Sequence, residues 1–200
     1  ADEPTQTRPA HRGAHLVQLE TQQSHLAIGL DAPPDRDADA YAHRVAIRIL
    51  GGATSSRRFT EVREKRGLAY GVYSYLYSRD LANAYMGSVS SANDRIGEGI
   101  TVIRDQWRLA AEEGVSEKEL QDAKTYLTGA YPLRFDGNST IAGILVGMQL
   151  IGLDPEYIKT RNARVDAVTL GDVKRVAGEL MDPDGLHFVV VGKPEGVVSE

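Results

Sequence analysis

Hydrophobic and polar positions change period several times along the chain, and each change predicts a new element. Residues 15–20 (HLVQLE) alternate between apolar and polar types, and residues 24–30 (SHLAIGL) do so after a polar break. Alternation of this kind predicts two strands. Between residues 33 and 52 the apolar residues recur at helical spacing, and Gly51-Gly52 is expected to end that helix.

The segment SSRRFTEVREKRG has the signals of a second helix. Ser55 or Ser56 can cap its start, because a serine oxygen accepts from the free backbone N–H groups of the first turn. Phe59 and Val62 are its predicted inward positions. Gly67 stands where a left-handed C-terminal residue belongs.

Residues 70–78 and 83–91 are rich in aromatic and small residues and predict an antiparallel hairpin. Tyr73, Tyr75 and Tyr77 would share one face of its first strand. They could contact a ligand, although packing beneath the helices is the favoured interpretation.

The remaining pattern is helical up to a last apolar strand at 185–192. Asn93-Asp94 is the predicted cap of one helix, and Ser116 with Glu119 forms an S-x-x-E capping box for the next. Residues 139–153 are apolar nearly all round, which predicts a buried helix.

Strands and helices are partly segregated in this order, which predicts an α+β fold. We expect one largely antiparallel sheet with helices packed on one face. Residues 1–12 are polar and contain proline, and are predicted to be a linker or N-terminal arm, with residues 13–200 forming a single domain.

Composition narrows the classes of function. The chain has 200 residues, of which 42% are hydrophobic and 26% charged, as in ordinary globular proteins. A net charge of −5 and the lack of long Lys/Arg runs argue against nucleic acid as a partner. No apolar run approaches the roughly 18 residues that span a bilayer, so no membrane association is expected. There are 0 cysteines, which excludes disulfides and thiolate metal sites.

Arg63 precedes Tyr70 by seven positions, with Gly67 between them. A chain reversal at Gly67 would bring the guanidinium and the phenol towards a common point. A guanidinium recognises carbonyl and carboxylate oxygens, and a phenol can donate to a developing oxyanion. The alternative, favoured on spacing alone, is a surface arginine on a helix where Glu61 and Lys65 pair, and a tyrosine that fills the sheet face.

The segment GGATSSRRFTEVREKRGLAYGVYSYLYS (51–78) resembles a signature of the pitrilysin and mitochondrial processing peptidase family of zinc endopeptidases. The shared run consists of glycines, a Ser-Ser helix start, an arginine, Gly-Leu-x-Tyr and a strand. The order of elements over residues 15–192 is also similar to one homologous half of such an enzyme.

The resemblance implies a site and its partners. Family members contain repeated αβ units around a closed chamber, and the N-terminal unit carries an H-x-x-E-H zinc motif. A later unit supplies an arginine and a tyrosine, which match Arg63 and Tyr70. Arg63 would orient the peptide substrate, and Tyr70 would stabilise the tetrahedral intermediate. The partner would be an N-terminal homologous half or a separate subunit.

The chain departs from the family pattern because it contains no H-x-x-E-H. In HRGAH (11–15) three residues separate the two histidines, and Ala14 stands where the general-base glutamate would be required. His25, His43 and His187 stand alone and are predicted to be structural. Catalytic zinc needs three ligands and an activated water. We therefore expect no metal in this chain, which alone should be inactive, and zinc in the complete enzyme.

Two hypotheses remain. The first is the C-terminal half of a zinc endopeptidase, which holds an unfolded peptide as an added strand. The second is a non-catalytic structural or assembly subunit, like the core proteins of the respiratory cytochrome bc complex. The start at Ala1 without an initiating Met favours a piece of a longer polypeptide. A homodimer is an alternative assembly, and bacterial cytoplasm and periplasm stay open as locations.

Overall fold

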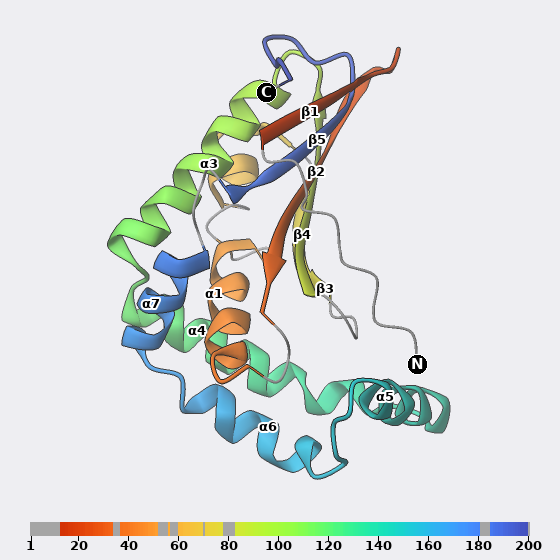
Figure 1. Cartoon of the computed structure of the whole chain (residues 1–200), viewed down its shortest axis with the longest axis vertical. Coiled ribbons are helices and arrows are strands. Elements are labelled where there is room, and N and C mark those ends of the chain that lie inside the picture. The colour runs from red at the N-terminus through yellow and green to blue at the C-terminus, as the bar shows by residue number, and fades with distance from the viewer. Residues whose placement is uncertain are drawn as a thin grey trace, which may run out of the picture.

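The structure is a computed structural model that describes residues 13–33, 37–51, 56, 60–69, 71–77, 83–180 and 185–199. The predicted linker at 1–12 lies outside the described residues. The described part contains one five-stranded sheet with helices on one of its faces (Figure 1).

The strands are β1 (Gly13–Gln18), β2 (Gln23–Ala32), β3 (Gly71–Tyr77), β4 (Asn83–Ala92) and β5 (His187–Gly192). Their order in the sheet is β1-β5-β2-β4-β3. Only β1 and β5 run parallel, and the other neighbours are antiparallel. The predicted α+β fold with a largely antiparallel sheet is therefore confirmed.

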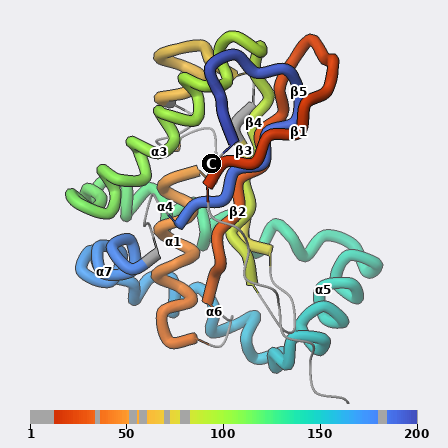
Figure 2. The backbone as a smooth tube through the Cα atoms, turned by 45° about the horizontal axis from the view of Figure 1, so that its top comes forward, coloured from red at the N-terminus to blue at the C-terminus, as the bar shows by residue number. Residues whose placement is uncertain are grey.

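The helical elements are α1 (Ala40–Gly51), the π-helix η1 (Thr60–Lys65), α3 (Ile96–Glu113), α4 (Glu117–Ala130), the 3₁₀ turn η2 (Pro132–Arg134), α5 (Asn138–Leu150), α6 (Tyr157–Asp166) and α7 (Leu170–Leu180). Helices α1, α3 and α7 lie on one side of the sheet, whereas α5 and α6 lie at the end remote from β1 and β5 (Figures 1 and 2). The predicted capping box is present at α4, where the Ser116 Oγ accepts from the Glu119 N–H at 3.3 Å.

The cap predicted at Asn93-Asp94 is wrong, because α3 begins at Ile96 and no side chain caps it. The Asn93 amide instead joins two distant segments. Its Nδ2 donates to the Thr21 carbonyl at 2.8 Å, and its Oδ1 accepts from the Ser24 hydroxyl at 2.7 Å. Tertiary partners thus compete with a local cap for the same polar atoms.

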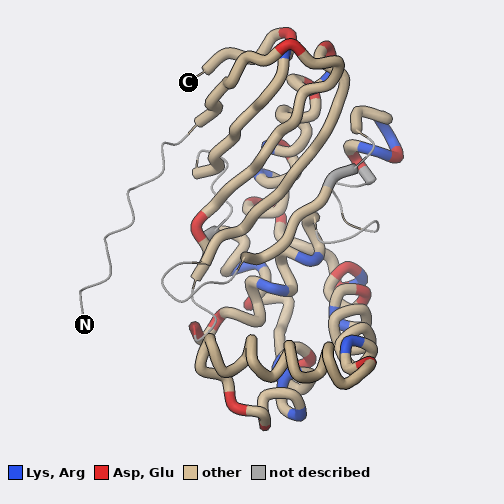
Figure 3. The backbone as a smooth tube through the Cα atoms, turned by 90° about the vertical axis from the view of Figure 1, so that its right-hand side faces the viewer, with Lys and Arg blue, Asp and Glu red and all other residues tan. Residues whose placement is uncertain are grey.

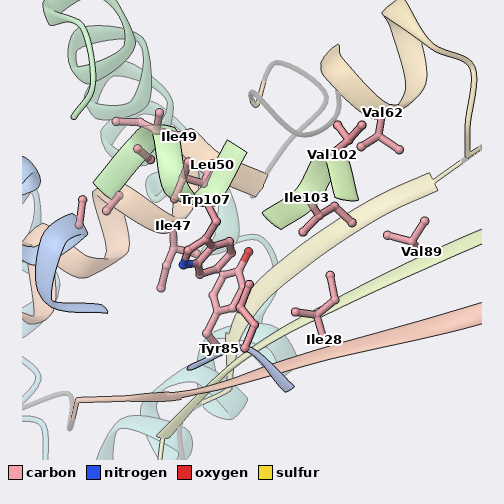
Figure 4. Packing of buried hydrophobic residues seen from close by; sticks show 14 of the residues in the cluster. Ile28, Ile47, Ile49, Leu50, Val62, Tyr85, Val89, Val102, Ile103 and Trp107 are labelled. Carbon is pink, nitrogen blue, oxygen red and sulfur yellow. The ribbon is translucent and has the colours of Figure 1, made fainter. Parts of the chain in front are cut away.

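The core lies between the covered face of the sheet and the helices (Figure 4). Trp107 of α3 is 2% exposed and meets Tyr85 of β4 edge to face, with ring centroids 5.0 Å apart. Ile28 of β2, Leu50 of α1 and Ile103 of α3 are also buried. These contacts bind the long helix α3 to the middle of the sheet.

We expect Trp107→Ala to lower the free energy of unfolding by about 3–5 kcal/mol, since it removes a buried aromatic side chain and leaves a cavity. Leu133→Ala is the control, because Leu133 is 78% exposed and its loss should cost no more than about 0.5 kcal/mol. Trp107 is the single tryptophan, so the variant has no tryptophan fluorescence to follow. Denaturant unfolding of both variants should therefore be measured by circular dichroism. Equal stability of the two variants would contradict this account of the core.

Candidate substrate-binding surface

Arg63 lies on the π-helix η1, where the chain turns sharply into the sheet. The Gly67 N–H donates to the Arg63 carbonyl at 3.0 Å, and the Leu68 N–H donates to the Val62 carbonyl at 2.8 Å. Each bond spans one residue more than in the usual Schellman ending of an α-helix. Gly67 has a φ of +58°, as expected for the residue that ends a helix. Val62 is fully buried, which confirms it as an inward position.

The turn after Arg63 is fastened to the sheet by polar contacts. Arg95 donates to the Gly67 carbonyl at 3.1 Å and to the Arg66 carbonyl at 2.9 Å, two groups left free at a helix end. The buried Ser91 hydroxyl of β4 donates to the Leu68 carbonyl. The backbone on the C-terminal side of Arg63 is therefore held in a defined position beside α3 and β3.

The partner predicted for Arg63, Tyr70, lies outside the described residues, so their convergence stays a prediction. The ion pair between Glu61 and Lys65 is present, with Nζ and Oε1 2.5 Å apart, and Arg66 also pairs with Glu61. The hydrogen bond from Lys65 is the largest cause that lowers the pKa of the Glu61 carboxyl. Glu61 is thus held by the two basic residues that follow Arg63.

The tyrosines of β3 lie on the face of the sheet that the helices leave open. Tyr73, Tyr75 and Tyr77 are exposed, with Tyr73 at 63%, whereas Ser74 is buried on the covered face. The favoured expectation that the tyrosines pack beneath the helices is therefore wrong. Alternation identifies which side chains share a face, but it does not reveal which face the helices cover.

The open face carries almost no charge (Figure 3). The five strands contain one Asp, Glu, Lys or Arg, which is Asp31 of β2. Val17 of β1 and Val189 of β5 are also exposed there, together with the tyrosines of β3. A neutral, partly apolar sheet face is suited to contact another polypeptide.

Helix α5 contradicts the prediction of a buried helix. Only Met148 is buried in it, whereas Val146 is 55% and Leu150 72% exposed. No charged residue occurs from 137 to 153, and α5 extends beyond the sheet on its open side (Figures 1 and 3). Within the described ranges, no helix combines the length and the hydropathy needed to cross a membrane.

The histidines do not assemble a metal site in the described residues. No group of three or more His, Asp or Glu side chains there could hold a metal ion. His25 Nδ1 lies 2.8 Å from the Ser90 hydroxyl on the open face, while His43 is buried in α1. Because these residues do not fit a catalytic zinc, we assign no step of a reaction to a metal in this chain.

Comparison with known proteins shows the family. The model of the peptidase M16 inactive domain matches residues 2–127. An uncharacterized zinc protease of Streptomyces coelicolor is 31% identical over 169 residues, which are 83% of this chain and 36% of the relative. A non-peptidase homolog of Helicobacter pylori is 24% identical over 179 residues, or 88% of this chain and 41% of the relative.

Among solved structures, the peptidase M16 inactive domain of Pseudomonas fluorescens superposes with a TM-score of 0.84 at 26% identity. The match covers 98% of this chain and 47% of that structure.

The chain therefore belongs to the peptidase M16 family, as an inactive domain of zinc-protease-like proteins. The resemblance to the half without the zinc motif is confirmed. The chain spans 36% and 41% of the length of these two curated relatives, so more than half of each relative lies outside the match.

We expect His43 to make stability depend on pH. The side chain is 5% exposed, its Nδ1 has no hydrogen-bond partner in the described structure, and burial lowers its pKa. The unfolded chain then takes up the proton first, so stability falls as pH drops below about 6.5, the usual histidine pKa. Denaturant unfolding at pH 7.5 and 5.5 should show a larger loss in the wild type than in His43→Leu. An equal loss in both would refute the assignment.

Proposed function

We propose that this domain is the substrate-holding half of a zinc endopeptidase that cleaves peptides in a closed chamber. Zinc and the activated water come from a homologous N-terminal half or a partner subunit. Residues 13–200 act as one unit in this proposal. Arg63 orients the peptide, and Tyr70 stabilises the tetrahedral intermediate.

The observation that carries the proposal is the position of Arg63. It precedes a turn that Arg95 and Ser91 hold by hydrogen bonds, and its π-helix contacts α3 and the edge strand β3. A guanidinium held by rigid backbone can donate to a peptide carbonyl with little loss of conformational entropy. Tyr70 would then donate its phenol proton to the oxyanion that forms at the scissile carbonyl.

The edge of the sheet supports binding of an extended peptide. β3 is the last strand on its side, and among the described residues no further strand pairs with its outer edge. An extended peptide can add to such an edge through main-chain hydrogen bonds, while neighbouring side chains supply selectivity. Tyr73 and Tyr75 are exposed beside it and provide aromatic surface for that purpose.

Helix α5 is the proposed docking element for the partner half. Its uncharged surface extends on the open side of the sheet, where a facing unit would enclose a chamber (Figure 1). Matched relatives are more than twice as long as this chain, which supports a partner unit of comparable size.

A second candidate function is a non-catalytic structural or assembly subunit. It is favoured by the similarity to the non-peptidase homolog of Helicobacter pylori. The two functions differ in the partner: an intact H-x-x-E-H in the accompanying half supports the peptidase, and a degenerate one supports the structural role.

In the complete assembly we expect Arg63→Ala and Tyr70→Phe each to lower kcat by about tenfold to a thousandfold, as for loss of one oxyanion-stabilising donor. Steady-state cleavage of a quenched-fluorescence peptide measures this. A chelator should abolish turnover by the assembly, and the chain alone should show none.

Lys65→Ala is the matched control for Arg63→Ala, because it removes an exposed cation from the same turn. Its turnover should stay within about twofold of the wild type, since an exposed ion pair contributes little to stability. Near-normal kcat in Arg63→Ala and Tyr70→Phe would remove both residues from the mechanism.

We expect the double variant Val146→Glu, Leu150→Glu to weaken association with the zinc-bearing half by at least about tenfold, because two charges would lose water on docking. Isothermal titration calorimetry of this chain with the separately produced half measures the effect. Val198→Glu is the control, as Val198 is 74% exposed near the C-terminus, which lies at the end of the molecule opposite α5 (Figure 1). Unchanged affinity in the double variant would place the interface elsewhere.

A further inference from the structure

A cavity of about 750 Å³ lies between α1, β3, α4, α5 and α6, on the helical side of the sheet. Four arginines line it, and none of the Asp and Glu residues that the structure describes does: Arg44, Arg48, Arg134 and Arg161. The whole chain has a net charge of −5, so this concentration of cations is a local feature. Its volume falls within the range of small-molecule sites, about 300–1,000 Å³.

Arg161 is the most buried of these cations, with 8% exposure. Its Nη1 donates to the Leu127 carbonyl at 2.6 Å and to the Asn162 Oδ1 at 2.9 Å. The guanidinium also lies over the Tyr131 ring, 4.4 Å from the centroid. Among the described residues it forms no ion pair, and the contacts given above are all with neutral groups. A buried cation of this kind favours an incoming anion.

Arg44 and Arg134 line the same cavity as Arg161. Arg44 donates to the Tyr157 hydroxyl at 2.8 Å, on the wall formed by α6. The guanidiniums of Arg161, Arg134 and Arg44 all act to lower the pKa of the Tyr131 phenol, although burial raises it overall. Tyr131 thus lies within the electrostatic influence of three guanidiniums that line the cavity.

The opposite wall is apolar. Ile144 and Met148 of α5 face the cavity, and Leu153 follows from the loop after α5. Gly143 and Gly147, which directly precede these two α5 residues, also line the cavity and have no side chains to fill it. The cavity thus combines a cationic side with an apolar side.

We propose that this cavity binds a carboxylate carried on an apolar body. Guanidinium groups pair with carboxylates through parallel hydrogen bonds, and the α5 wall would receive the apolar part. The C-terminal residue of a peptide and a medium-chain fatty acid share this chemistry. The site lies apart from Arg63 and the open face, and it does not depend on the proposed peptidase role.

Isothermal titration calorimetry on the full 200-residue chain tests the proposal. The probes are acetyl-Ala-Ala-Phe with a free carboxylate, the same peptide as its amide, octanoate and octanol. We expect at least one acid to bind at least tenfold more tightly than its neutral counterpart. The acid with the higher affinity identifies the source of the carboxylate.

Arg134→Gln should weaken binding of that acid about tenfold, because the charge-assisted hydrogen bond is lost. Arg134 is exposed at the mouth, so its replacement leaves the packed core intact. Arg108→Gln on α3 is the control, since Arg108 is 52% exposed and does not line the cavity. Equal affinity for acids and neutral probes, unchanged binding in Arg134→Gln, or no binding at millimolar concentration would each overturn the proposal.

Discussion

The packing of Trp107 against Tyr85 binds the long helix α3 to the middle of the sheet, and the rest of the structure depends on this contact. Helix α3 covers one face of the sheet, and the other face stays exposed. Phe188 and Val190 of β5 join the same core, which connects the end of the chain to its centre. One-sided burial of this sort is common for antiparallel sheets, where one face packs on the core.

The open face and α5 both expose apolar side chains, which is typical of surfaces that contact another polypeptide. Both present neutral and apolar side chains to solvent, and they lie on the same side of the molecule (Figure 3). The matched relatives and the solved M16 structure are about twice as long as this chain or longer. These surfaces therefore support the proposed contact with a second unit.

A domain without a metal can still supply binding groups to a reaction. The turn after Arg63 contains the left-handed Gly67, and the side chains of Arg95 and Ser91 donate hydrogen bonds to its backbone carbonyls. These contacts fix the position of the turn. The arginine cavity lies on the helical side of the sheet, apart from Arg63 and the open face, and α5 forms one of its walls. The two proposed sites would therefore use different chemistry: Arg63 would contact a peptide backbone, and the cavity would bind a carboxylate carried on an apolar body.

The sequence by itself determined the type and order of the elements, the capping box at Ser116, the turn at Gly67 and the family. These features depend on residues near each other in the chain, where period, capping and turn geometry act. Only the tertiary structure decided that Tyr73 is exposed, that α5 is uncovered and that Asn93 bridges two segments. It also brought Arg44, Arg134 and Arg161 together. Each outcome depends on what packs against a residue from a distant part of the chain, and local periodicity carries no information about that partner.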